Sequence, residues 1–141
     1  MLKKAGIINA PLLFGLAELG HRDVAIVTDA GFPIPSQLRR IDVALIPGVP
    51  SMMQTLEAVV AEADIEEAIV SREMADANPR MLQGMRELLM RTEGIELRLI
   101  PHEDFKKASQ YAKFALRTGE VTPYSNIMLI AGAKTHIETK R

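Results

Sequence analysis

Three stretches of this 141-residue sequence carry side chains that can move protons or bind hydroxyl groups. The first is 20–23 (Gly-His-Arg-Asp) with Asp29 shortly after it, the second is 101–104 (Pro-His-Glu-Asp), and the third is 123–126 (Pro-Tyr-Ser-Asn). Imidazole gives and accepts protons near neutrality. Carboxylate and amide groups form hydrogen bonds with hydroxyl groups. We therefore take these three stretches as candidates for a functional site.

Each stretch also has an ordinary structural interpretation, and the residue types alone leave both open. A histidine that follows a helix, as His21 does, is commonly a partner of the carboxyl end of that helix. Asp29, two positions before Gly31, is typical of a turn residue that bonds its own backbone. The polar run His102-Glu103-Asp104 is typical of a helix start.

Several other chemistries lack the residues or the spacing that they need. The sequence has no cysteine, which excludes a thiol nucleophile, a disulfide framework and cysteine-ligated metals. His21, His102 and His136 are widely separated and lack the close pairing of a helix-borne metal site. Gly-x-Gly is absent, and no serine lies in a Gly-x-Ser-x-Gly context. We expect no metal site, no phosphate-binding loop and no hydrolase elbow.

The elements that must position these stretches alternate between helices and short apolar strands. A first helix is expected after Asn9, with Pro11 in its first turn and Gly20 as a left-handed stop. Further helices are expected over 50–62, from Asn78-Pro79 to about 89, and over 103–116. Strands are expected over 24–28, 43–46, 65–70, 95–100 and 126–131.

Strands separated by helices indicate an α/β fold with a mostly parallel central sheet flanked by helices. In such a sheet, ligands bind in the loops that follow the carboxyl ends of the strands. The length fits one domain, and no repeat or linker divides the chain. We expect a single domain over 1–141, with 134–141 as a charged tail.

Charge and hydropathy narrow the partners and the compartment. The net charge of −1 offers no general attraction to nucleic acid or to anionic lipid. No apolar run approaches the roughly 20 residues of a membrane helix, and the start is unlike a signal peptide. We expect a cytoplasmic protein that binds neither nucleic acid nor membranes. Residues 62–104 carry a charge of −6 and 105–141 carry +5, which fits either complementary subunit surfaces or a solvated exterior.

Several segments in a fixed order closely resemble the D-ribose pyranase family. They are 19–23 (Leu-Gly-His-Arg-Asp), 29–35 (Asp-Ala-Gly-Phe-Pro-Ile-Pro), 40–45 (Arg-Ile-Asp-Val-Ala-Leu), 48–51 (Gly-Val-Pro-Ser), 78–79, 102–106, 117–120 and 124–126. The resemblance extends from about Lys3 to Gly132. The L-fucose mutarotases share the Gly-His and Asp-Ala elements but resemble this chain less over 31–35 and 40–50.

The resemblance implies a ribose pyranase-like fold and an isomerase that interconverts the pyranose and furanose forms of D-ribose without a cofactor. It also implies a cytoplasmic homodecamer of two stacked pentamers, with sites between neighbouring subunits. His21 would be the catalytic acid/base. The sugar site would be lined by Asp29, His102, Lys106, Tyr124 and Asn126.

Three departures and two alternatives accompany this interpretation. Phe32 stands where a smaller aliphatic residue is common, Ser125 replaces the usual Ala, and 133–141 lacks the family's short apolar finish. Asp23 is expected to orient His21 or to cap backbone amides. One alternative is a mutarotase for L-fucose or another sugar. The other is a non-catalytic sugar-binding protein that assists transport.

Overall fold

A six-stranded sheet forms the centre of the computed structural model, which describes residues 1–2 and 5–134. The strands are β1 (Val24–Thr28), β2 (Arg39–Asp42), β3 (Ile65–Ser71), β4 (Leu97–Ile100), β5 (Phe114–Arg117) and β6 (Ile127–Ala131), in the order β2-β5-β1-β6-β3-β4. The helices are α1 (Ala10–Ala17), α2 (Met52–Glu62), α3 (Met74–Ala77), α4 (Pro79–Glu93) and α5 (His102–Ser109).

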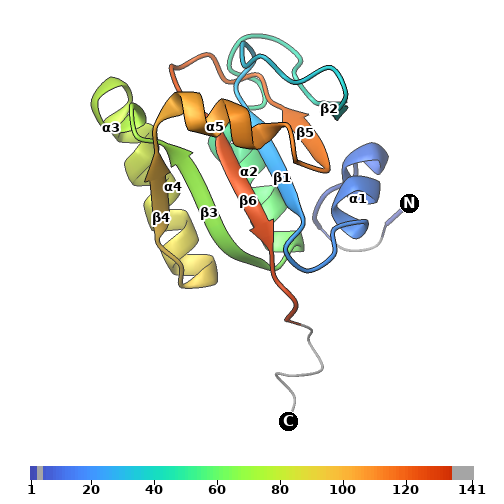
Figure 1. Cartoon of the computed structure of the whole chain (residues 1–141). Helices are drawn as coiled ribbons and strands as arrows, with labels where there is room; N and C mark the ends of the chain where they lie inside the picture. Colours follow the sequence, from blue (N-terminus) through green and yellow to red (C-terminus); the bar gives the residue numbers. More distant parts are fainter. Residues whose placement is uncertain (3–4, 135–141) are drawn as a thin grey trace.

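Five strands run parallel, and only β6 is antiparallel, between β1 and β3. Figure 1 shows α5 in front of the sheet, with α2 and α4 behind it. Side chains alternate between the two faces of a strand. In β1, Ala25 and Val27 therefore pack with the core of α2 and α4, while Ile26 packs with Phe105 of α5. The prediction of an α/β fold with a mostly parallel, helix-flanked sheet is confirmed.

Side-chain caps lie at the starts of two expected helices: α1 begins after Asn9 as predicted, and α2 begins two residues later than the expected 50. The Asn9 side chain accepts a hydrogen bond from the backbone N–H of Leu12 at 2.9 Å. Ser51 and Gln54 form a reciprocal capping box at the start of α2. Such caps satisfy backbone N–H groups that the first turn leaves without partners.

Three local predictions are wrong. The expected helix over 103–116 ends at Ser109, and Phe114–Arg117 instead forms β5, which pairs with both β2 and β1. The expected strand over 43–46 lies earlier, at Arg39–Asp42. The left-handed residue after α1 is Arg22 (φ 73°), not Gly20. The residues of β2 and β5 become strands because they pair with each other and β5 pairs with β1, and local periodicity does not contain information about such distant pairing.

Two sequence expectations concern membrane helices and the charged end of the chain. In the part of the chain that the structure describes, no helix combines the length and the apolar character needed to cross a membrane. The predicted charged tail lies outside the described residues except for Lys134, whose backbone N–H donates to the carboxylate of Asp64 at 2.7 Å.

Candidate active site

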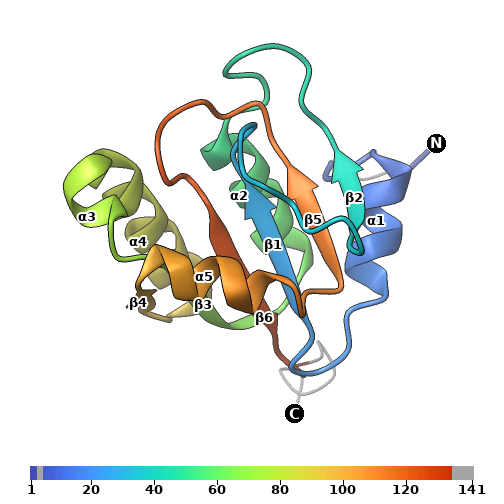
Figure 2. The same cartoon turned by 45° about the horizontal axis from the view of Figure 1, so that its top comes forward.

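Four of the predicted site residues lie together at the carboxyl end of the parallel strands. Asp29 follows β1, His102 follows β4, and Tyr124 and Asn126 precede the antiparallel β6, which starts at this end. Figure 2 shows the segments after β1 and before β6 meeting at the same end of the sheet. The parallel topology thus gathers residues that are up to 97 positions apart.

Asp29 and Asn126 are held by two reciprocal hydrogen bonds. The backbone N–H of Asp29 donates to Oδ1 of Asn126 at 2.9 Å, and Nδ2 of Asn126 donates to Oδ2 of Asp29 at 3.3 Å. Oδ1 of Asp29 also accepts from the N–H of Gly31 at 3.0 Å, so the turn interpretation of Asp29 holds as well. Partial burial raises the pKa of Asp29, against the lowering effect of these hydrogen bonds.

The imidazole of His102 is surrounded on several sides. Its ring lies 5.0 Å from the ring of Tyr124 in an edge-to-face arrangement and 6.4 Å from that of Phe105, nearly parallel to it. Nδ1 of His102 lies 2.7 Å from the hydroxyl of Ser71, and the backbone N–H of His102 donates to the carboxylate of Glu73. Ring orientation and helix start are therefore both determined by side chains from the end of β3.

Phe32, one of the departures from the family pattern, also lies at this site. Its ring contacts those of His102 and Phe105 edge-to-face, with centroids 6.4 and 5.8 Å away. Such aromatic contacts favour one ring orientation. Phe32 thus forms part of the apolar wall beside His102.

Tyr124 lies in the loop before β6, and hydrogen bonds of the neighbouring residue hold this loop in place. Tyr124 itself has a positive φ of 56°, which is uncommon for a residue with a side chain. The neighbouring Ser125 is fully buried, and its hydroxyl lies 2.7 Å from that of Thr122 and 3.0 Å from Nδ2 of Asn78. Asn78, which the sequence suggests as a helix cap, makes no side-chain cap bond and serves this loop instead.

A buried carboxylate ties the same loop to α2. Glu120 accepts hydrogen bonds from the backbone N–H of Met52 at 2.9 Å and from the hydroxyl of Thr122 at 2.9 Å. Gly119 is in close contact with the carbonyl of Val49, where any side chain would collide with backbone. The loop that carries Tyr124 is therefore closely packed against the start of α2 and the backbone of Val49.

His21 lies at the opposite end of the sheet, before β1. At about 3.3 Å per residue, the five residues of β1 separate it from Asp29 by roughly 16 Å. Nε2 of His21 lies 3.1 and 3.2 Å from the two oxygens of Glu66, and the side chain is 55% exposed. Within one chain, the structure does not bring His21 together with the other predicted site residues.

Glu66, not Asp23, orients His21. Glu66 also accepts from Arg22 at 2.9 Å, and the hydrogen bonds from Arg22 and then His21 lower the pKa of Glu66. Asp23 instead caps the backbone N–H of Gly20 at 2.8 Å, the second role that the sequence suggests for it. Because a carboxylate only accepts hydrogen bonds, Nε2 of His21 carries a proton in this contact, and Nδ1 has no hydrogen-bond partner among the described residues.

Lys106 lies one turn after His102 on α5, as the spacing predicts. Its ammonium group pairs with Glu103 at 2.8 Å, and its side chain is 36% exposed. The structure gives it no hydrogen bond to Asp29, His102, Tyr124 or Asn126 among the described residues. Lys106 therefore shares α5 with His102, but its side chain is directed to Glu103 and does not join the cluster through a contact of its own.

Sequence reasoning missed four residues that hold the site: Glu66, Ser71, Glu73 and Glu120. The pair Glu66-Glu67 inside an apolar strand is a visible signal, because paired charges in such a strand need partners. Ser71 and Glu73 carry no local signal, since their partner His102 lies 31 and 29 positions away, and the Met52 N–H that donates to Glu120 lies 68 positions away.

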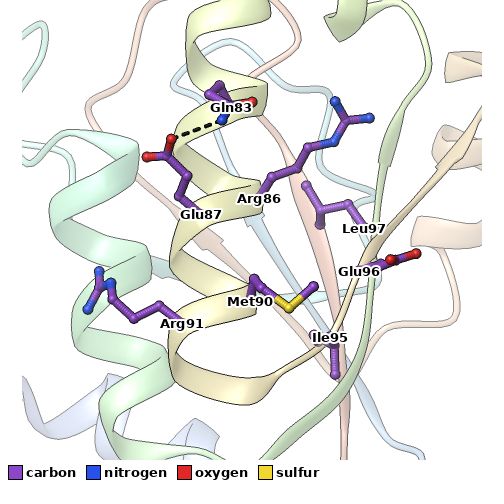
Figure 3. A pocket seen from close by; sticks show the side chains of 8 residues that line it. All are labelled: Gln83, Arg86, Glu87, Met90, Arg91, Ile95, Glu96 and Leu97. Atoms are coloured by element: carbon purple, nitrogen blue, oxygen red, sulfur yellow. Dashed lines mark hydrogen bonds between the residues drawn. The ribbon is translucent and has the colours of Figure 1, made fainter.

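Two surface hollows lie outside the cluster, the second of them along the loops beside Asp29. One, of about 720 Å³, lies between α4 and the start of β4 and is lined by Arg86, Met90, Ile95 and their neighbours (Figure 3). The other, of about 240 Å³, lies beside Ala30 and Arg117. Neither is lined by any of the six predicted site residues. The candidate site is therefore the cluster of Asp29, His102, Tyr124 and Asn126.

Comparison with known proteins adds independent information. The model of the RbsD / FucU transport protein family matches residues 2–134. A D-ribose pyranase from Geobacillus kaustophilus is 42% identical over 131 residues, which is 93% of this chain and 94% of that protein. One from Laribacter hongkongensis is 41% identical over 93% of this chain and 98% of that protein.

Solved structures agree with this assignment. Bacillus subtilis RbsD, in a structure complexed with D-ribose, gives a TM-score of 0.88 at 36% identity, over 95% of this chain and 100% of that one. The Streptococcus pneumoniae fucose mutarotase, in complex with L-fucose, gives 0.78 at 22% identity over 91% and 95%, which shows the shared fold alone. This chain belongs to the RbsD / FucU transport protein family.

Proposed function

We propose that this protein is an isomerase that interconverts the pyranose and furanose forms of D-ribose. The observation that carries the proposal is the cluster of Asp29, His102, Tyr124 and Asn126 in a chain 42% identical to a protein named D-ribose pyranase. The cluster offers carboxylate, imidazole, phenol and amide groups at one end of the sheet. These are the groups that bind a neutral polyhydroxy compound.

The reaction needs only proton transfers. A proton leaves the anomeric hydroxyl while another reaches the ring oxygen, and the ring opens to the aldehyde. A different hydroxyl then closes on the carbonyl, so no electron is transferred and no group leaves the sugar. Such a reaction requires no nicotinamide, metal or covalent nucleophile. A group that both gives and accepts protons near neutrality suffices, and imidazole is that group.

Each residue of the cluster offers the sugar a different kind of contact. The Asp29 carboxylate keeps free lone pairs beyond its bonds to Gly31 and Asn126, and these accept hydrogen bonds from sugar hydroxyls. Tyr124 offers its ring face or its hydroxyl, and His102 offers its ring nitrogen. Lys106 reaches the sugar once it exchanges Glu103 for a sugar oxygen.

His21 serves as the acid/base from a neighbouring subunit. Its Nε2 donates to Glu66, which leaves Nδ1 as the atom that takes up and returns a proton. Since His21 and Asp29 lie at opposite ends of one sheet, a complete site forms where the His21 end of one copy meets the Asp29 end of another. From the family resemblance we extend the proposal to the assembly, a cytoplasmic decamer of two stacked pentamers.

The exposed surface near the cluster supports contact with a second copy. Four apolar residues in the loops beside Asp29 are exposed: Leu45, Ile46, Val49 and Val121. Contiguous exposed apolar surface next to a polar site is typical of an interaction surface. A neighbouring subunit on these loops would cover the apolar residues and bring its own His21 end to the site.

Magnetisation-transfer NMR on D-ribose tests the function. We expect the wild type to speed exchange between the pyranose and furanose signals. His21→Ala should remove most of that acceleration, because general acid–base catalysis contributes about 10² to 10⁴ in rate. Arg98→Ala is the matched control, since Arg98 pairs with Glu67 at the same end of the sheet.

The same experiment separates the competing functions. Wild-type protein that leaves ribose exchange unchanged overturns the proposal. Exchange limited to the α and β forms of L-fucose, with ribose inert, identifies a mutarotase of the sister group. Ribose binding without acceleration at any pH from about 5 to 8 identifies a non-catalytic binding protein.

A further inference from the structure

Three polar side chains form a row across neighbouring strands at the end of the sheet that carries the cluster, and Asn126 belongs to both the row and the cluster. Val27 pairs with Ile127 and Ile127 with Val70, so the next positions in register are Thr28, Asn126 and Ser71. Val27, Ile127 and Val70 face the core of α2 and α4. Because side chains alternate along a strand, the row of Thr28, Asn126 and Ser71 faces α5 and His102.

In the described part of the chain, the Ser71 hydroxyl has one side-chain partner, which is His102. Ser71 is fully buried, and its Oγ lies 2.7 Å from Nδ1 of His102. The geometry of His102 leaves little freedom, because Glu73 holds its backbone N–H and the rings of Phe105 and Tyr124 flank its imidazole. The serine hydroxyl therefore meets a ring nitrogen whose position is already determined.

The direction of the proton between these two atoms follows from counting donors and acceptors. If Nδ1 of His102 donated, the hydroxyl hydrogen of Ser71 would need a second acceptor. Among the residues that the structure describes, the Ser71 hydroxyl has no hydrogen-bond partner other than His102. A buried donor without an acceptor is unfavourable. Every buried donor has an acceptor only if the Ser71 hydroxyl donates its hydrogen to Nδ1 of His102 and Nδ1 accepts it.

We infer that Ser71 is a positioning residue that holds His102 as the tautomer with its proton on Nε2. This inference rests on the proposed function, in which His102 faces the sugar. His102 then presents an N–H donor to an acceptor oxygen of the sugar, such as the ring oxygen. His21 has its proton directed to Glu66 and presents a free Nδ1. The two imidazoles thus have different tasks, one as hydrogen-bond donor and the other as proton acceptor.

Nitrogen-15 NMR of the imidazole rings of the full-length protein without sugar tests the tautomer directly. At pH 8, above the ordinary titration range of imidazole, His102 should show a protonated Nε2 and an unprotonated Nδ1. Ser71→Ala should give a mixture of both tautomers, and Ser71→Thr, which keeps the hydroxyl, should restore the single tautomer. Ser109→Ala is the matched control, because Ser109 is equally buried but donates to the carbonyl of Lys106.

Ribose kinetics supply the second readout. Loss of one aligned hydrogen bond should lower kcat/KM of Ser71→Ala by roughly 5- to 10-fold, mainly through KM, with recovery in Ser71→Thr. A wild-type His102 with its proton on Nδ1, or a tautomer unchanged in Ser71→Ala, overturns the inference. If wild-type protein does not accelerate ribose exchange, the proposed function fails. The NMR measurement of the His102 tautomer without sugar still tests whether Ser71 positions His102.

Discussion

Asp29 holds a carboxylate in a partly buried position between the end of β1 and the start of β6. Burial raises its pKa above the ordinary 3.8, because the charged form loses hydration. The folded chain therefore keeps the proton of Asp29 to a higher pH than the unfolded chain does. The contribution of Asp29 to the free energy of unfolding is greatest at low pH and falls as the pH rises through the raised pKa.

The same shift predicts how ribose binding depends on pH. Protonation removes an acceptor from the site, so ribose affinity should fall as the pH is lowered through the raised pKa of Asp29. Carbon-13 NMR of the carboxyl group should give a midpoint above 3.8, and calorimetry should give the affinity. Asp29→Asn, which cannot titrate, should bind weakly at every pH. A carboxyl midpoint at or below 3.8 would contradict the prediction.

Thr28 carries a buried hydroxyl with no hydrogen-bond partner among the described residues. Thr28→Val keeps the shape and removes the unsatisfied group, so it should raise the free energy of unfolding by about 1 kcal/mol. Thr118→Val is the matched control, because the equally buried Thr118 hydroxyl donates to the Thr28 carbonyl at 2.7 Å. The control should lower stability by about 1–3 kcal/mol. Denaturant unfolding at one protein concentration measures both, and equal losses would refute the argument.

The loop between β5 and β6 shows how one element positions a functional side chain. Glu120, Thr122, Ser125 and Asn78 form a continuous hydrogen-bonded network beneath Tyr124. The hydroxyl of Ser125, which the sequence analysis treats as a departure from the family pattern, joins this network through Asn78 and Thr122. Asn78 keeps Thr122 and the carbonyl of Pro123 as partners when Ser125 is removed.

Ser125→Ala should therefore weaken the fold slightly and leave the chemistry nearly intact. We expect a loss of about 1 kcal/mol in the free energy of unfolding. The kcat for ribose exchange should stay within about twofold, since Tyr124 remains held by the rest of the loop. Thermal unfolding and NMR exchange measure the two effects. A large loss of kcat with unchanged stability would show that the Ser125 hydroxyl acts on the sugar site itself.

For the whole molecule, the two ends of the sheet carry complementary halves of the proposed site. His21 with Glu66 occupies one end, and Asp29 with Asn126 and His102 occupies the other. One fold cannot bring its own two ends together, so the proposed site, with His21 as its acid/base, would need at least two copies. The exposed apolar loops beside Asp29 give a surface on which a second copy can pack.

Mixed oligomers test this arrangement. His21→Ala and Asp29→Asn should each be inactive alone. Random co-assembly of equal amounts should restore about one quarter of the wild-type rate, because that share of subunit contacts joins an intact His21 to an intact Asp29. Sedimentation checks that mixed assemblies form. Mixed assemblies without activity, or a wild-type monomer at micromolar concentration, would contradict sites between subunits.

Much of the fold could be predicted where the signal is local. Val24–Thr28 is a run of buried, mostly β-branched residues, and Asn9 and Ser51 are effective caps, so these elements begin close to where the sequence places them. The order of family motifs identified the family. Each of these signals lies within a few neighbouring residues, or in their order along the chain.

Contacts between distant segments were decided only by tertiary packing. Phe114–Arg117 becomes a strand because β2 and β1 flank it, which overrides its helical periodicity. Glu66 reaches His21 across 45 positions, and Ser71 reaches His102 across 31. Residue types along the chain indicate which groups can move a proton. Strand order and register determine which of those groups share an end of the sheet, because they set the distances over which hydrogen bonds form.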